Sequence, residues 1–253
     1  MLSKLFGFRK KDTTDLPAVS HPYAFLGTDM HSHLLPGIDD GAQTIEDSLN
    51  LIKSLMAMGY TGFITTPHIK SDIYPNTTAT IGNAFNELQQ ALTANNIHVP
   101  IRAAAEYYID DRFFDMLENE KLLTIHGNEV LVEFSFVFEP VRLNDTIFRI
   151  QTRGYTPVFA HPERYTFFHH KPEIFREIKS RGCLLQLNTL SITGYYGKSV
   201  KDTAEWLLKE GLYDYCGTDM HHERHAEGLQ KLAASKNYLL LQNYNFLNKR
   251  LSQ

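Results

Sequence analysis

Apolar positions along the chain follow two patterns that alternate with each other. In residues 44–59, "TIEDSLNLIKSLMAMG", apolar residues recur at helical spacing, Thr44 and Asp47 resemble a capping box, and Gly59 is suited to end the helix. The same spacing recurs in three further segments: 81–96, 171–182 and 202–211. Short, nearly continuous apolar runs that are typical of buried strands lie between the helical segments.

Seven of these apolar runs predict strands, because each is bounded by glycine or polar residues. They are residues 23–28, 61–66, 97–105, 129–134, 156–160, 183–188 and 213–218. Strands that alternate with helices run parallel, since each crossover helix returns the chain to the same end of the sheet. We therefore expect an α/β fold in which residues 21–253 form one domain, with a sheet that closes fully or nearly into a barrel.

The first 20 residues form a basic segment outside this alternation. Within residues 1–12, Leu2, Leu5 and Phe6 could line one face of a short helix surrounded by basic residues, as in segments that bind membrane surfaces. A frayed tail is the simpler explanation. The apolar run is too short for a secretion signal or a membrane-spanning helix, so we expect a cytoplasmic protein and keep peripheral membrane contact as an alternative.

Charge and cysteine content narrow the function. The formal net charge of -4 gives no general attraction for nucleic acid, so an anionic ligand must be bound by local cations or by metal. Cys183 and Cys216 are the two cysteines, which argues against a disulfide framework and suits a reducing compartment. Neither is followed by an arginine at the spacing of a thiol phosphatase loop, so we expect both to be structural.

Polar residues able to bind metal follow the ends of the predicted strands. In a parallel barrel the carboxyl ends of the strands meet at one rim, so residues far apart in the sequence converge there. Asn188 ends the sixth strand, and Asp39 and Asp40 follow the first strand in "TDMHSHLLPGIDDGA". The other donors at strand ends are His31, His33, His68, Glu106, Glu133, His161, Asp219 and His221.

The residue types indicate divalent metal ions, because imidazole and carboxylate groups bind manganese, zinc or iron. With one of the two aspartates, the set has five histidines and four carboxylates, more than a single ion binds. We therefore expect two or three ions in one cavity. Four other histidines follow no strand, and we expect them to lie outside the site: His98, His126, His169 and His170.

Six motifs contain these donors: "DMHSHLLPGIDDGA", "TTPHI", "AEYY", "VLVEFS", "AHPERY" and "GTDMH". They resemble the motifs of the PHP superfamily, named for polymerase and histidinol phosphatase. More narrowly, they resemble the bacterial PHP-type protein-tyrosine phosphatases of capsule or exopolysaccharide loci, in the same order from Asp29 to His221. The resemblance implies a distorted seven-stranded (βα)7, TIM-like barrel, the PHP fold, and metal-dependent phosphomonoester hydrolysis.

The resemblance also implies three metal ions with assigned ligands. The first would be held by His31, His33, Glu106 and Asp219; the second by Glu106 as a bridge, Glu133 and His161; and the third by Asp40, His68 and His221. The choice of Asp40 over Asp39 follows from the motif alignment alone, and the pair could be reversed.

Two arginines and two tyrosines are further candidates. Arg164 lies three residues after His161 and matches the family's phosphate-binding arginine, with a rim salt bridge as the alternative. Arg224 is a second candidate catalytic arginine, although its spacing from the preceding histidine departs from the family pattern. Tyr195 and Tyr196 follow the sixth strand and either stack on a substrate ring or pack within their loop.

The resemblance implies a phosphotyrosyl protein as substrate, specifically a membrane-anchored bacterial tyrosine autokinase that controls polysaccharide export. It favours manganese as the metal, with zinc or iron as alternatives. Two other activities stay open at this point. One is a histidinol phosphatase with the same fold, and the other is an amidohydrolase-type barrel, which would require an eighth strand and a histidine in place of Asn188. A metal-free binding protein is a third alternative.

Overall fold

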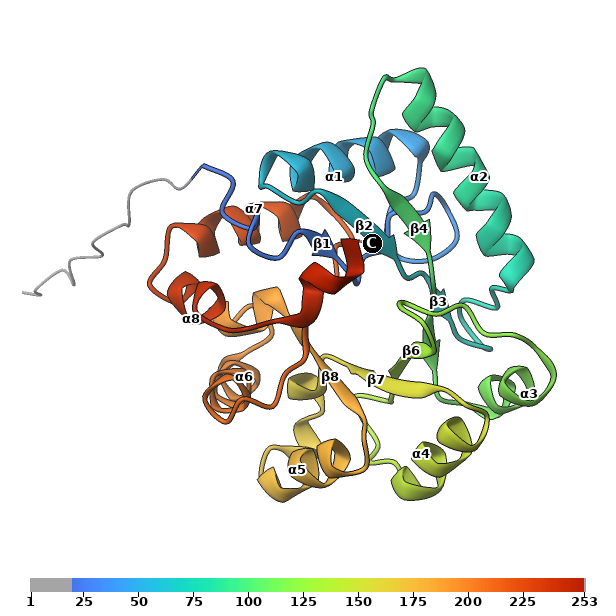
Figure 1. Ribbon diagram of the computed structural model, residues 1–253, viewed down its shortest axis with the longest axis vertical. Coiled ribbons are helices and arrows are strands. Elements are labelled where there is room, and N and C mark those ends of the chain that lie inside the picture. The colour runs from blue at the N-terminus through green and yellow to red at the C-terminus, as the bar shows by residue number, and fades with distance from the viewer. Residues whose placement is uncertain (1–19, 253) are drawn as a thin grey trace, which may run out of the picture.

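The computed structural model describes residues 20–252, so the expected basic tail and the proposed contact through residues 1–12 lie outside the described residues, apart from Ser20. Figure 1 shows a ring of short strands with helices arranged around its outer side. The α-helices in the described part of the chain are α1 (Ile45–Ala57), α2 (Thr78–Ala94), α3 (Asp111–Asn119), α4 (Leu143–Thr152), α5 (Pro172–Ser180), α6 (Lys198–Lys209), α7 (Glu223–Ala233) and α8 (Tyr238–Gln242). Among these described helices, none combines the length and the hydropathy needed to cross a bilayer.

The strands of the described residues form two sheets in which every pairing is parallel. The smaller sheet has the order β1 (Thr28–Asp29), β2 (Gly62–Thr65) and β4 (Ile101–Ala103). The larger sheet has the order β3 (His68–Ile69), β5 (Glu106–Tyr108), β6 (Glu129–Glu133), β7 (Thr156–Ala160), β8 (Leu184–Asn188) and β9 (Tyr215–Gly217).

The structure is thus a mixed α/β fold with curled parallel sheets, and the expected count of seven strands is not confirmed. The second expected strand, residues 61–66, corresponds to β2, and beyond it the chain resumes as a further strand: β2 ends at Thr65 and β3 begins at His68, after Pro67, which has no N–H to donate. The third expected strand, residues 97–105, contains only β4, and after a two-residue interruption the chain resumes beyond the expected bounds as β5, which begins at Glu106. Hydrogen bonds continue across the division, from Ala104 N to Thr65 O (2.8 Å) and from Glu106 N to Pro67 O (3.1 Å), so the register is unchanged.

The first expected strand, residues 23–28, is largely wrong. The segment begins as a turn in which Leu26 N donates to Tyr23 O (3.0 Å), and pairing with β2 starts only at Thr28. Tyr23 is fully buried and stacks on Tyr60, with ring centroids 5.6 Å apart. An apolar run is buried in either conformation, so its composition alone did not distinguish a turn from a strand.

Helix starts follow the capping chemistry of the sequence. Thr44 Oγ1 accepts from Asp47 N (3.1 Å) and Asp47 Oδ2 accepts from Thr44 N (3.0 Å), which confirms the expected capping box of α1. Thr77 and Thr80 form the same reciprocal pair at the start of α2. The helical segments named from the sequence omitted α3, α4, α7 and α8; only α8, with five residues, is too short to show a helical period.

Alternation along the strands separates two faces. In β6, Val130 and Val132 belong to the large core between the strands and the helices, whereas Leu131 belongs to a smaller apolar cluster on the opposite face. Because side chains alternate, Glu129 and Glu133 share the face of Leu131. The inner face is therefore apolar at its centre, with the carboxylate of Glu133 placed at the carboxyl end of the strand.

Candidate active site

The segments that follow β1 and β9 lie side by side at the carboxyl ends of the strands. Asp219 N donates to His31 O (2.7 Å), and His33 N donates to Met220 O (2.9 Å). Gly41 approaches this junction so closely that a Cβ at its position would lie 2.2 Å from His33 O. Glycine is therefore required in the "DDG" turn, and the turn holds its two aspartates next to the histidines.

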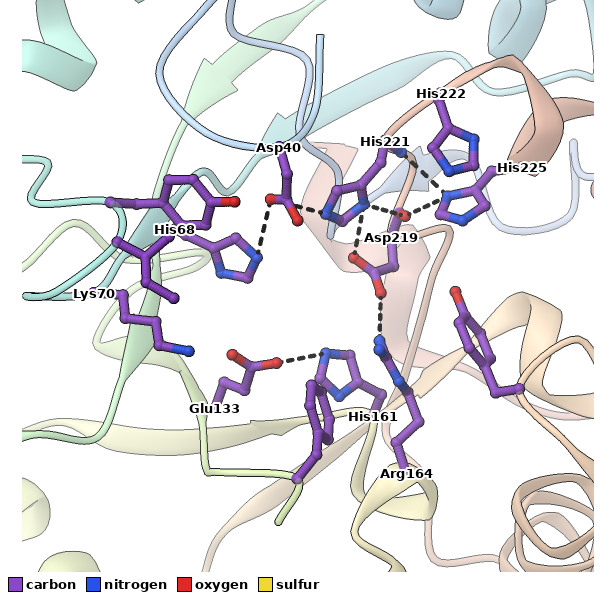
Figure 2. Close-up of a pocket in the computed structure, with 14 residues that line it drawn as sticks. Asp40, His68, Lys70, Glu133, His161, Arg164, Asp219, His221, His222 and His225 are labelled. Atoms are coloured by element: carbon purple, nitrogen blue, oxygen red, sulfur yellow. Dashed lines mark hydrogen bonds and ion pairs between the residues drawn. The ribbon is translucent and has the colours of Figure 1, made fainter.

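Figure 2 shows side chains from distant parts of the chain directed into one cavity. The nine donors expected from the sequence form four overlapping groups, and within each group one nitrogen or oxygen atom of every residue lies within 4.8 Å of the others. The groups are His33, Asp40, His68 and His221; His31, Glu106 and His161; His31, His33 and Asp219; and His68, Glu106 and Glu133. The structure thus brings together every donor that the strand-end pattern identified.

Glu106 lies at the centre of these groups and is fully buried. Its Oε2 atom lies 3.0 Å from His68 Nδ1 and 3.3 Å from His31 Nε2, and its Oε1 atom lies 3.1 Å from His161 Nε2. Burial alone would raise the pKa of Glu106, but the imidazoles of His31 and His68 outweigh burial and hold the pKa well below its ordinary value. The Glu106 carboxylate is therefore ionised, and its two oxygens contact several imidazoles.

Hydrogen bonds on the outer side fix how the imidazoles face the cavity. His31 Nδ1 bonds Gln186 Oε1 at 2.8 Å, and His221 Nδ1 bonds the backbone oxygen of Asp219 at 2.8 Å. Because these acceptors require a proton on Nδ1, the Nε2 lone pair of each ring is free to bind a metal ion. Gln186 also accepts from His161 N (3.2 Å) and so connects two of the strand ends.

Asp39 and Asp40 have different positions in the site. Asp39 is buried, its Oδ2 accepts from His33 Nδ1 (2.7 Å) and His68 N (3.0 Å), and it therefore orients His33 from outside the cavity. Asp40 Oδ1 lies 3.6 Å from both His68 Nε2 and His221 Nε2, inside the cavity. The geometry favours Asp40 as the ligand and Asp39 as the residue that positions a ligand.

The chemistry of the donor set fits divalent metal ions. His31 Nε2 and His33 Nε2 lie 3.3 Å apart, and the buried Glu106 Oε2 has no well-formed hydrogen bond among the described residues. Buried acceptors that face one another are costly unless a cation neutralises them. Burial, followed by the nearby charge of Glu106, raises the pKa of Glu133 to about 8, so this carboxyl keeps a proton at neutral pH unless a cation displaces it.

Arg164 reaches the same cavity from the 3-10 turn Pro162–Arg164. Its Nη1 donates to Asp219 Oδ2 (2.9 Å), and its guanidinium carbon lies 4.5 Å from the ring centre of Phe136 and 4.4 Å from that of Tyr196. The two rings therefore hold the guanidinium plane between them. A planar arginine fixed in this way can present its remaining N–H groups to a phosphate or carboxylate.

The cavity has a volume of about 540 Å³ and contains residues that the sequence analysis did not identify. They are Lys70, Ile73, Tyr74, Phe136, His222 and His225. A signal for Lys70 was present, because residues two apart on a strand share a face and Lys70 follows His68 by two. Phe136 and His225 carried no such signal, since loop geometry and a helix start place them.

Two sequence candidates lie elsewhere. Arg224 does not line this cavity; it is exposed on the first turn of α7 and lines two neighbouring depressions, one of which His221 also lines. Tyr195 does not line the cavity either, is 47% exposed, and packs its ring against Tyr196 and His225, with centroid distances of 4.9 and 5.3 Å. Of the tyrosine pair, only Tyr196 faces the site.

Parallel strands with outer helices, and a cluster of metal donors at the carboxyl ends of those strands, define the class of metal-dependent hydrolases with barrel-like α/β folds. Within that class, a family model described as "Capsular polysaccharide synthesis, CpsB/CapC" matches residues 27–239. The chain belongs to this family, and the resemblance identified from the six motifs is confirmed.

Named relatives agree with this placement. The chain is 28% identical over 195 residues to the tyrosine-protein phosphatase YwqE of Bacillus subtilis, covering 77% of each chain. It is 25% identical over 194 residues to the putative tyrosine-protein phosphatase CapC of Staphylococcus aureus, covering 76% of each, and 26% identical over 200 residues to the tyrosine-protein phosphatase CpsB of Streptococcus pneumoniae, covering 77% of this chain and 82% of that one.

Solved structures show the same fold. A structure from a study of YwqE and CpsB, described as unique metal-dependent tyrosine phosphatases, matches with a TM-score of 0.72 and 26% identity over 87% of this chain and 96% of that chain. The lactonase Lmo2620 of Listeria monocytogenes matches with a TM-score of 0.52 and 11% identity, over 91% of this chain and 92% of that one. At that identity the likeness to the lactonase concerns the fold alone.

We expect Mn²⁺ to raise the melting temperature of the metal-stripped chain, because an ion that binds only the folded state stabilises it. At a free concentration about 100 times Kd, the gain is about 2.7 kcal/mol per ion, or roughly 5 °C or more for a chain of this size. Glu106→Gln should show a much smaller rise, since it removes a shared anionic donor. Lys53→Met, on the exposed side of α1, is the matched control. Calorimetry in which Glu106→Gln and the control respond equally to Mn²⁺ would contradict the donor assignment.

Proposed function

We propose that this chain is a metal-dependent protein-tyrosine phosphatase that acts in the synthesis of capsular or exported polysaccharide. The observation that carries this proposal is one cavity lined by Arg164 and by six of the nine metal donors, with the other three, His31, His33 and Glu106, buried within 4.8 Å of members of that set, a combination suited to a phosphate group. The chain's family, and the tyrosine phosphatase names of relatives that it matches over about three quarters of its length, support the same reaction.

We propose that two or three divalent ions occupy the cavity, with manganese favoured and zinc or iron as alternatives, because all donors are nitrogen or oxygen. Overlap between the donor groups supports the sharing of Glu106 between ions. For the fold, the unbroken register across the divided strands supports a distorted barrel with seven strand positions. The proposed ligands, ion by ion, are His31, His33, Glu106 and Asp219; Glu106, Glu133 and His161; and Asp40, His68 and His221.

Divalent ions held by these residues would supply positive charge to the phosphate oxygens and would activate a water molecule for attack. The chain itself provides position. Arg164 is held by Asp219 and by the rings of Phe136 and Tyr196, so its free N–H groups are preorganised to bind phosphate oxygens as charge develops on them. The leaving group is a phenol with an ordinary pKa near 10, so it departs more readily than an alkoxide and needs no dedicated acid.

The alternatives differ in what they require at the rim. An amidohydrolase of the kind considered above needs a histidine where this chain has Asn188, and Asn188 Nδ2 instead donates to Asp219 Oδ2 (2.8 Å) and to Tyr196 OH (3.1 Å). Asn188 therefore positions other residues and offers no lone pair of the kind that a histidine ligand would. A histidinol phosphatase would use the same metal centre, so it remains the second candidate.

The proposed substrate is a phosphotyrosyl protein, in particular a membrane-anchored tyrosine autokinase of the polysaccharide export system. A basic and partly apolar segment, residues 1–12, would hold the enzyme at the inner face of the membrane near that substrate. Co-sedimentation with vesicles containing anionic lipid should capture the full chain more efficiently than a chain that lacks residues 1–12. Equal capture of the two chains would remove the membrane contact and leave the phosphatase proposal intact.

Metal-stripped enzyme refilled separately with manganese, zinc and iron should release phosphate from a phosphotyrosyl peptide at a higher kcat/KM than from histidinol phosphate. The aromatic residues beside Arg164, Phe136 and Tyr196, can contact a substrate ring of matching size. Colorimetric measurement of free phosphate gives both rates under the same conditions. A preference for histidinol phosphate would support the second candidate, and no release from either substrate would reject both.

Arg164→Ala should lower kcat/KM for the phosphotyrosyl peptide by roughly 100-fold or more, because it removes a preorganised cation from the developing charge on phosphate. Arg224→Ala is the matched comparison and should change kcat/KM by less than about two-fold, since Arg224 lies outside the cavity. Metal content, measured by elemental analysis, should be equal in both variants and in the wild type. Comparable losses in the two variants would restore the catalytic role first considered for Arg224.

A further inference from the structure

The cavity contains one cationic side chain that the assignments above leave without a role. Lys70 follows β3 and lines the cavity beside His68 and Tyr74. Figure 2 shows its amine directed into the cavity towards Glu133, on the opposite side of the view from Arg164. Among residues 20–252, no carboxylate oxygen lies within 4.0 Å of Lys70 Nζ, so no ion pair within the described residues neutralises its charge.

The backbone around Lys70 is held firmly. Lys70 N donates to Tyr74 O (2.9 Å) and Tyr74 N donates to Lys70 O (2.9 Å), which closes a tight turn. Ser71 N and Ser71 Oγ both donate to Asp110 Oδ2, at 3.1 and 2.8 Å, and Asp110 Oδ1 caps the start of α3. The turn is thus connected to β3 of the larger sheet on one side and to the start of α3 on the other. The Cα atom of Lys70 is therefore held in a fixed position, although the side chain is long.

The side chain itself is directed by an aromatic ring. Lys70 Nζ lies 4.1 Å from the ring centre of Tyr108, the last residue of β5. A cation over an aromatic face is attracted to it without losing its net charge, unlike a cation paired with a carboxylate. The half-buried ammonium therefore keeps its full charge for an anionic ligand while it is held on the cavity wall.

The charge requirements of the substrate explain why a second cation is needed there. A phosphomonoester carries close to two negative charges over three terminal oxygens. Arg164, the other non-imidazole cation on the cavity wall, already gives one N–H to Asp219. Arg224, which the sequence suggested as a partner for Arg164, lies outside the cavity. A phosphate bound by Arg164 from one side would leave oxygens facing the wall that contains Lys70.

We propose that Lys70 is a substrate-binding residue that bonds a terminal phosphate oxygen opposite Arg164. This inference rests on the proposed phosphatase function, because it places a phosphomonoester in the cavity. Lys70 would contribute to binding in both the ground state and the transition state, since its charge and position are present before the reaction begins. Its loss should then appear mainly in KM and in the affinity for inorganic phosphate.

Steady-state kinetics of the manganese enzyme with p-nitrophenyl phosphate and with a phosphotyrosyl peptide would test this role. Lys70→Met should raise KM by roughly ten-fold or more for both substrates, because a charged hydrogen bond is lost, and Lys70→Arg should recover part of the affinity. Lys53→Met, exposed on α1, is the matched lysine control and should behave as the wild type. A rise in KM for the peptide alone would overturn the proposal, since it would mean that Lys70 contacts the peptide rather than the phosphate.

Titration calorimetry with inorganic phosphate gives a measurement that does not depend on turnover. Phosphate should bind the manganese-loaded wild type and Lys53→Met equally and bind Lys70→Met roughly ten-fold more weakly, with equal metal content in all three. Equal phosphate affinity in Lys70→Met, or no binding by the wild type, would overturn the role of Lys70. If phosphate binding depends on Lys70 but no phosphotyrosyl substrate is hydrolysed, the proposed function fails while the assignment of Lys70 stands.

Discussion

The burial of Glu106 among imidazoles is the interaction on which the rest of the site depends. A fully buried carboxylate is very unfavourable unless positive charge surrounds it, and here the three nearest nitrogen atoms belong to His31, His68 and His161. Each of these histidines comes from a different strand end. The negative charge of the buried Glu106 carboxylate must be compensated, and the groups next to it come from several strand ends. Divalent cations compensate this charge better than protons do.

The divided strands determine where Glu106 and His68 lie. Each residue begins a strand of the larger sheet, directly after the interruption that ends a strand of the smaller sheet. His68 of β3 and Glu106 of β5 are paired in the register of these two neighbouring strands. The interruption contains Thr66, Pro67, Ala104 and Ala105, and none of them has a large side chain that would fill the inner face. The imidazole and the carboxylate can therefore occupy the space above the apolar inner cluster. The irregularity of the sheet is part of how the site is built.

Much of this site could be predicted from the sequence, because residues that follow the carboxyl ends of parallel strands all lie at the same rim of the fold. Strand ends were identifiable from apolar runs, and the nine donors expected as metal ligands gather in one cluster. The sequence was less decisive where the outcome depends on local backbone direction. Asp39 and Asp40 are neighbours with the same chemistry, and only the close approach of Gly41 to His33 decides which of them faces inward. Arg224 lies on the exposed first turn of α7 and lines neighbouring depressions rather than the cavity, a position that its spacing from His221 did not reveal.

Specificity must come from a different part of the molecule than the metal donors. A lactonase shares the fold at 11% identity, so the arrangement of strands and helices does not by itself select phosphate. The features that we propose select phosphate here are the cations and rings around the donors: Arg164 beside Phe136 and Tyr196, and Lys70 over Tyr108. These residues lie in loops, in a short turn or at a strand end, where sequence can change without altering the buried donors. Under the proposed function, the metal donors would provide the reactivity, and the surrounding loops would select the substrate.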